Sequence, residues 1–61
     1  MNHSSNWIMV WKGQPTNGML AAQMLREHGL DVRENTDLVT RLYVHPEDEA
    51  TAQDLFKDWE L

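Results

Sequence analysis

The side chains that could take part in metal, nucleophilic or acid–base chemistry are three histidines, two serines and ten carboxylates. His3 lies near the amino end, His28 follows an amphipathic segment and His45 precedes a proline. No two of them have the i, i+4 spacing of zinc ligands on a helix. Ser4 and Ser5 lack the Gly-x-Ser-x-Gly surroundings of a nucleophile elbow. We therefore expect no metal site and no serine nucleophile.

Most of the carboxylates that could act as general acids or bases stand late in the chain: Glu47, Asp48, Glu49, Asp54, Asp58 and Glu60. Acid–base catalysis needs a buried or paired carboxylate with a shifted pKa in a cleft. These residues lie mainly off the apolar stripe of their helix, which favours a solvated acidic face. That face either keeps the protein soluble or binds a basic protein partner. The glycines match no phosphate-binding loop, and there is no cysteine. We expect no enzyme and no cofactor.

The amino-acid composition limits which binding partners and which cellular compartment we expect for this chain. Ten acidic against five basic residues give a net charge of −5, which repels phosphate backbones and anionic lipid, so nucleic acid and membrane surfaces are poor candidates. The longest apolar run, Trp7 to Trp11, is too short to span a bilayer, and no basic segment precedes it. The absence of cysteine fits a reducing compartment. We expect a cytoplasmic protein.

The first half of the chain predicts a strand and a helix that would position these groups. Residues 1–6 are polar and predict a flexible tail, followed by a single domain over residues 7–61. The aromatic and β-branched run from 7 to 11 predicts a strand. Pro15 opens a helix and Gly29 ends it. Its apolar face is predicted to comprise Leu20, Ala21, Met24 and Leu25. Gly18 within this helix indicates close packing against the sheet.

The second half predicts two more strands and a closing helix. Side chains alternate over residues 30–35 and again over 39–45, with a turn at 35–37 between them. Pro46 stops the third strand and begins the last helix. The apolar stripe of that helix consists of Ala52, Leu55, Phe56 and Trp59.

Strand–helix–strand–strand–helix order predicts an α+β fold, a βαββα two-layer sandwich related to the ferredoxin-like unit. We expect a three-stranded sheet in the order 1-3-2. A right-handed crossover would make strands one and three parallel neighbours, with strand two antiparallel to strand three. Both helices are then expected on one face of the sheet, and the other face is left uncovered.

Strand alternation divides the side chains between the two faces of this sheet. The core is expected to contain Ile8, Val10, Val32, Leu42 and Val44, packed against Leu20, Met24, Leu25, Ala52, Leu55 and Phe56. The uncovered face is expected to carry Trp7, Met9, Trp11, Arg33, Arg41, Tyr43 and His45. Such a patch exceeds what a monomer usually exposes, and its residue types are enriched in interfaces. The alternative is that a tryptophan folds over a sheet edge or that the tail covers the patch.

Two segments resemble a known family. The segment Pro15–Leu30, with Leu20, Met24-Leu25 and His28-Gly29-Leu30, is similar to its "proline, amphipathic helix, Gly-Ile" segment. The segment Leu42-Tyr43-Val44-His45-Pro46-Glu47-Asp48-Glu49-Ala50, followed by Ala52 and Leu55-Phe56, resembles its "Val-x-Pro-Glu-Glu-Asp-Ala, x-Ala-x-x-Leu-Leu" ending. The family is the small bacterial domain described as a prokaryotic signal-transducing protein with a PII-like (GlnB-like) fold.

The resemblance spans residues 7–59 and implies a signalling role without implying catalytic residues. Members often have a longer connection between the second and third strands, and some append a zinc ribbon, whereas this chain has a short connection and no cysteine. The nucleotide-binding loop of true PII proteins has no counterpart here, so ATP binding is not implied.

Together these observations predict a non-catalytic regulatory or protein-interaction module. A chain of 61 residues is near the lower limit for independent folding, so a second copy bound through the aromatic sheet face is the expected partner. The alternative is a PII-like domain that senses a small molecule at the sheet edge or in a dimer cleft. A platform for single-stranded nucleic acid, with bases stacked on the rings, is disfavoured by the acidic charge.

Overall fold

A computed structural model describes residues 6–59 of the chain. The elements follow the order β1 (Ile8–Gly13), α1 (Pro15–Glu27), β2 (Arg33–Thr36), β3 (Thr40–Val44), the short 3-10 helix η1 (Pro46–Asp48) and α2 (Glu49–Lys57). This confirms the predicted βαββα order. Most of the predicted tail, residues 1–5, lies outside the described residues.

The three strands form one antiparallel sheet in the order β1-β3-β2. Both outer strands pair antiparallel with β3. The order is therefore confirmed, but the prediction that the first and third strands are parallel is wrong. The parallel strands are β1 and β2, which α1 connects, and β3 lies between them. Because β3 leaves β2 through a tight hairpin, it must run opposite to β2 and hence also opposite to β1.

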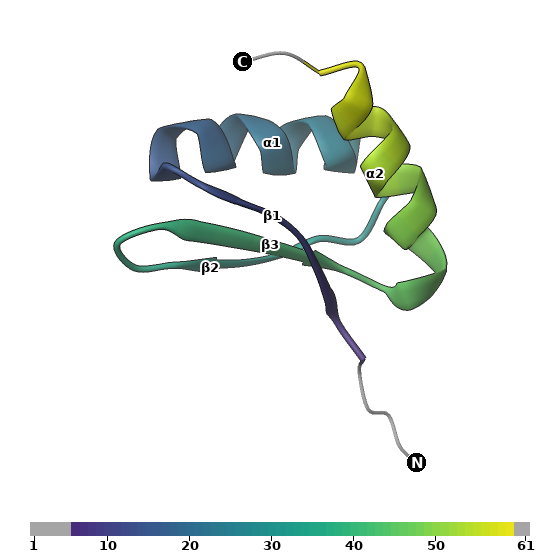
Figure 1. The fold of residues 1–61 in the computed structure, drawn as a ribbon, viewed down its shortest axis with the longest axis horizontal. Helices are drawn as coiled ribbons and strands as arrows, with labels where there is room; N and C mark the ends of the chain where they lie inside the picture. The colour runs from purple at the N-terminus through teal and green to yellow at the C-terminus, as the bar shows by residue number, and fades with distance from the viewer. Residues whose placement is uncertain (1–5, 60–61) are drawn as a thin grey trace.

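Both helices cover the same face of the sheet, as predicted (Figure 1). α1 runs along the sheet, whereas α2 crosses it at the end where β3 leads into η1. The fully or nearly buried apolar residues come from the helices and the strand region alike: Ala21, Ala22, Leu25, Val32, Leu42, Val44 and Ala52. The predicted core residues Val10, Met24, Leu55 and Phe56 pack against this cluster and stay partly exposed.

The buried face of α1 is rotated relative to the prediction. Leu20 was expected in the core but is 50% exposed, whereas Ala22 and Gly18 are buried. The smallest side chains of the helix thus face the sheet, which brings the helix backbone close to it. A Cβ atom added at Gly18 would lie 2.5 Å from Cγ2 of Thr40. The predicted role of Gly18 in close packing is confirmed.

The carboxyl end of α1 is closed by two backbone hydrogen bonds. The N–H of Gly29 donates to the carbonyl of Arg26 at 2.9 Å, and the N–H of Leu30 donates to the carbonyl of Leu25 at 3.2 Å. With Gly29 at φ 85°, this is a Schellman motif. The chain enters the sheet only at Arg33, later than the predicted start at Leu30. The N–H of Leu30 and the carbonyl of Val32 are bonded instead to the end of α1, at Leu25 and Arg26.

The β2–β3 hairpin is stabilised at its turn by Asp37. Its Oδ1 accepts hydrogen bonds from the N–H of Val39 at 3.2 Å and from Nη1 of Arg41 at 3.5 Å. The Val39 N–H, together with the Leu38 N–H and the Arg41 charge, holds the pKa of Asp37 below its ordinary value of 3.8.

Within residues 6–59, neither helix has the length and apolar character needed to cross a membrane.

The close approach at Gly18 predicts that Gly18→Ala destabilises the protein. Alanine improves helix propensity by about 1 kcal/mol. The clash with Thr40 displaces α1 from the sheet at a cost of about 1–3 kcal/mol, and a contact this short puts the cost at the upper end. Urea unfolding measures the difference. The control Gln23→Ala, at an exposed position of the same helix, should change stability by less than about 0.5 kcal/mol. A Gly18→Ala variant more stable than the wild type would contradict the packing.

The lowered pKa of Asp37 predicts a pH-dependent effect of Asp37→Asn, which keeps an acceptor oxygen and removes the charge. Because the folded-state pKa is the lower one, the carboxylate stabilises the fold above its unfolded-state pKa, and this contribution disappears as the pH falls through the folded-state pKa. The melting temperature of the variant should therefore be lower than that of the wild type near neutral pH. The two should converge as the pH falls below the folded-state pKa of Asp37. A constant difference across this range would assign the effect to something other than the charge.

Candidate interaction surface

The face of the sheet that the helices do not cover is defined by the alternation along β3. Thr40, Leu42 and Val44 are buried beneath the helices, so Arg41 and Tyr43 point to the opposite side. Directly paired residues on neighbouring strands share a face. The pairing therefore gives two rows across the sheet, Met9–Tyr43–Arg33 and Lys12–Arg41–Asn35. We call the surface formed by these six residues, with Trp7 and His45 at one end, the open face.

Trp11 does not belong to the open face, which corrects the prediction. The pairing of β1 with β3 passes from Met9↔Tyr43 directly to Trp11↔Leu42, so Val10 is an extra residue without a partner. This β-bulge reverses the alternation of β1 and turns Trp11 to the helix side, where it packs against the core. Its indole lies over Gly13: a Cβ there would be 2.6 Å from the ring.

At one end of the open face, Trp7 lies across the ends of two strands. Its ring stacks on His45 with centroids 4.3 Å apart, and the guanidinium carbon of Arg33 lies 4.8 Å from the ring centroid. Nε2 of His45 is in turn 2.9 Å from Oδ2 of Asp31. These contacts hold the indole against the sheet by stacking and cation–π attraction. The open face is therefore less apolar than the predicted row of tryptophans.

The open face is basic although the chain is acidic. Lys12, Arg33 and Arg41 lie on it, which is three of the five basic side chains in the chain. Arg41 is 3.5 Å from Asp37 at the edge of the hairpin. Among residues 6–59, no carboxylate lies within ion-pair distance of Lys12 or Arg33. The surface thus combines two unpaired cations with the rings of Trp7 and Tyr43.

Lys12 and Asn35 are open-face residues that the sequence reasoning missed. The predicted first strand stops at Trp11, whereas β1 continues to Gly13. One signal was present in the sequence. Strict alternation from Ile8 and Val10 would place the lysine at position 12 in the core, which indicates that the alternation breaks before it.

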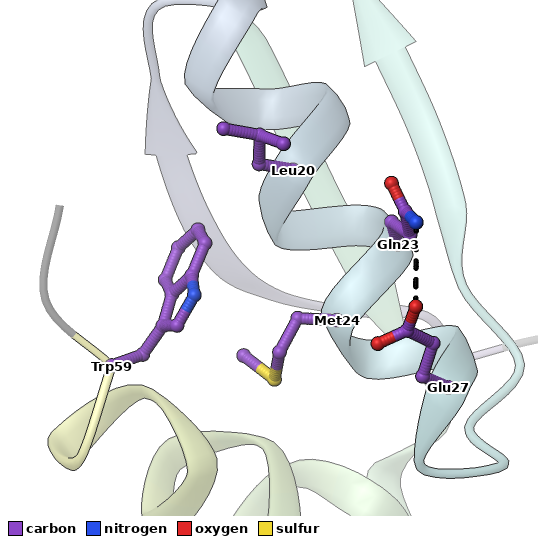
Figure 2. A pocket seen from close by; sticks show the side chains of 5 residues that line it. All are labelled: Leu20, Gln23, Met24, Glu27 and Trp59. Atoms are coloured by element: carbon purple, nitrogen blue, oxygen red, sulfur yellow. Dashed lines mark hydrogen bonds between the residues drawn. The ribbon is translucent and has the colours of Figure 1, made fainter.

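A shallow hollow of about 280 Å³ lies on the helix side of the molecule. Figure 2 shows Trp59 across from Leu20 and Met24, with Gln23 and Glu27 along the same helix. Nε2 of Gln23 donates to Oε2 of Glu27 at 3.3 Å. Glu27 is the one titratable group in this lining, so the hollow holds no pair of groups for proton transfer or nucleophilic attack.

Over residues 6–59, no three histidine, aspartate or glutamate side chains gather closely enough to hold a metal ion. Comparisons of the chain with protein-family profiles, curated proteins and solved structures give no match. The resemblance to the PII-like signalling domain stays a prediction.

The bulge predicts unequal losses of stability at Met9 and Trp11, two apolar positions of β1. Trp11→Lys removes a large ring from the helix side and should lower the free energy of unfolding by about 2–4 kcal/mol. Met9→Lys alters an open-face side chain that is 48% exposed and should cost less than about 1 kcal/mol. Urea unfolding followed by circular dichroism compares the two variants. Equal losses at both positions would show that the indole does not pack beneath the helices.

Proposed function

We propose that this chain is a non-catalytic regulatory interaction module that self-associates through its open face. The observation that supports the proposal is the composition of that face. Trp7, Met9 and Tyr43 lie on a sheet surface that neither helix covers, beside Arg33 and Arg41. Tryptophan, tyrosine, methionine and arginine are the side chains enriched at the centres of protein interfaces.

The small core supports a second copy as the partner. Of the seven buried apolar residues in the described part of the chain, three are alanines: Ala21, Ala22 and Ala52. They bury little area, so the core contributes little stability of its own. A partner that binds only the folded chain adds to its stability by mass action.

The expected affinity is low. Complete burial of Trp7, Met9 and Tyr43 contributes roughly 1.5 kcal/mol per side chain, because each is already partly covered. Association costs about 4 kcal/mol or more in rigid-body freedom. The net free energy of association is therefore small, as suits a weak and reversible regulatory contact.

The regulatory role and the compartment rest on the sequence. The segment from Leu42 to Phe56 resembles the ending of a signalling domain, and we carry over signalling from that resemblance alone. The absence of cysteine supports the cytoplasm as the place where the module acts.

Sedimentation of the wild type and of Met9→Lys at up to about 1 mM tests self-association. The wild type should sediment above its monomer mass of 7.1 kDa as its concentration rises. Met9→Lys should remain a monomer, because it replaces an apolar side chain at the centre of the contact with an ammonium group whose burial is costly.

Met19→Lys is the matched control, because it makes the same change at an apolar side chain on α1 that is 69% exposed. It should associate like the wild type. A wild type that stays monomeric at about 1 mM, or a Met9→Lys variant that associates as strongly, would rule out the open face as the contact.

A further inference from the structure

We propose that the surface bound by the open face is the acidic outer side of η1 and α2 of a second copy, in a head-to-tail contact. This inference rests on the proposed function, because it names the partner of the same face. It assigns two different surfaces of each chain to one interface.

The charge of the open face argues against a symmetric contact of face with face. In such a dimer each copy contributes the same surface. The cations of Lys12, Arg33 and Arg41 would then be brought toward their counterparts in the other copy, and like charges across an interface repel. Only Arg41 has a carboxylate nearby within the described residues, and that residue, Asp37, lies at the hairpin edge. The partner of this face must therefore bring negative charge.

The outer side of η1 and α2 provides that charge. Between Pro46 and Trp59 there are five carboxylates and one lysine. Of the carboxylates, Glu47, Glu49, Asp54 and Asp58 are exposed. The lysine, Lys57, lies 3.7 Å from Asp54, and both side chains are largely solvated. Residues 46–59 thus hold five of the nine carboxylates found between residues 6 and 59, and their outer side is complementary in sign to the open face.

The dimensions of the two surfaces also agree. Nine helical residues make α2 about 13 Å long, and three strands about 4.8 Å apart make the sheet of similar width. Between its carboxylates, α2 exposes Ala50 and Thr51, which are small enough to let the helix approach the rings of Trp7 and Tyr43. A helix laid across the sheet would therefore contact cations and rings together.

The two surfaces lie on opposite sides of one chain, so a chain cannot satisfy its own open face. The helices cover one side of the sheet and the open face is the other (Figure 1). A contact between two different surfaces is heterologous, and repetition of it produces a ring or an open chain of copies. In an open chain only the two terminal copies keep an unused surface, and closure of a ring joins these two surfaces.

Two charge-reversal variants test this arrangement. Lys12→Glu/Arg33→Glu changes only the open face, and Asp54→Lys/Asp58→Lys changes only the helix, at an end where the helix dipole favours cations. Each variant alone should sediment as a monomer at concentrations at which the wild type associates. Mixed in equal amounts, the two variants should associate again. The unchanged open face of one binds the unchanged helix side of the other, and the two reversed surfaces are also opposite in sign.

The control Gln23→Lys/Glu27→Lys reduces the net negative charge on the exposed side of α1 without changing a residue of either surface, and it should associate like the wild type. If Asp54→Lys/Asp58→Lys associates normally while Met9→Lys does not, the open face is the contact and the head-to-tail inference is wrong. If the wild type itself is monomeric, the proposed function fails before this inference is reached.

Single-stranded nucleic acid is the other anionic partner that a basic, aromatic face could bind, and a labelled oligothymidylate tests it. Fluorescence anisotropy should show no binding to the wild type at about 100 mM salt, because Lys12 and Arg33 can neutralise only a few phosphates and salt weakens such contacts. A different result would identify nucleic acid, not a second copy, as the partner of the open face. In that result the wild type does not self-associate but binds the oligonucleotide, and Lys12→Glu/Arg33→Glu abolishes this binding.

Discussion

The alternation of side chains along β3 is the constraint on which the rest of the molecule depends. This central strand pairs with both neighbours, so its register determines which residues of β1 and β2 share each face. Its inward residues Leu42 and Val44 are fully buried and lie beneath the two helices. Its outward residues Arg41 and Tyr43 form the middle of the open face. The five residues of β3 thus contribute alternately to the core and to the open face.

The local signals in the sequence predicted the elements well, because each acts over a few residues. Pro15 at the start of α1 and Gly29 after its end are examples. What the sequence could not supply were long-range choices: the direction of β3 relative to β1, and the rotation of α1 that exposes Leu20. The rotation depends on how closely Gly18 approaches Thr40 of β3, and the spacing of apolar residues along the helix does not predict this contact. The prediction for Trp11 is wrong because it assumed strict alternation along β1, whereas the strand contains a bulge at Val10.

Net charge is a poor guide to the partner of this chain, because its charges are segregated. An overall charge of −5 coexists with a sheet face that carries three of the five basic side chains. Five of the ten acidic residues lie between Pro46 and Trp59, in η1, in α2 and just after it, and these helices cover the other side of the sheet. An average over composition cancels these two surfaces, whereas a partner meets only one of them at short range, because salt screens the more distant charges within about 10 Å.

The bulge at Val10 also bears on how this chain can vary in length. Since the extra residue has no partner on β3, its removal would leave Met9 opposite Tyr43 and Trp11 opposite Leu42. The strand could thus lose or regain one residue without a change in its pairing register with β3 on either side of the bulge. Homologous chains that differ by a single deletion here should superimpose at both ends of β1, with only the bend of the strand altered. Insertions and deletions are usually confined to loops, and in this fold a strand interior offers a second place for them.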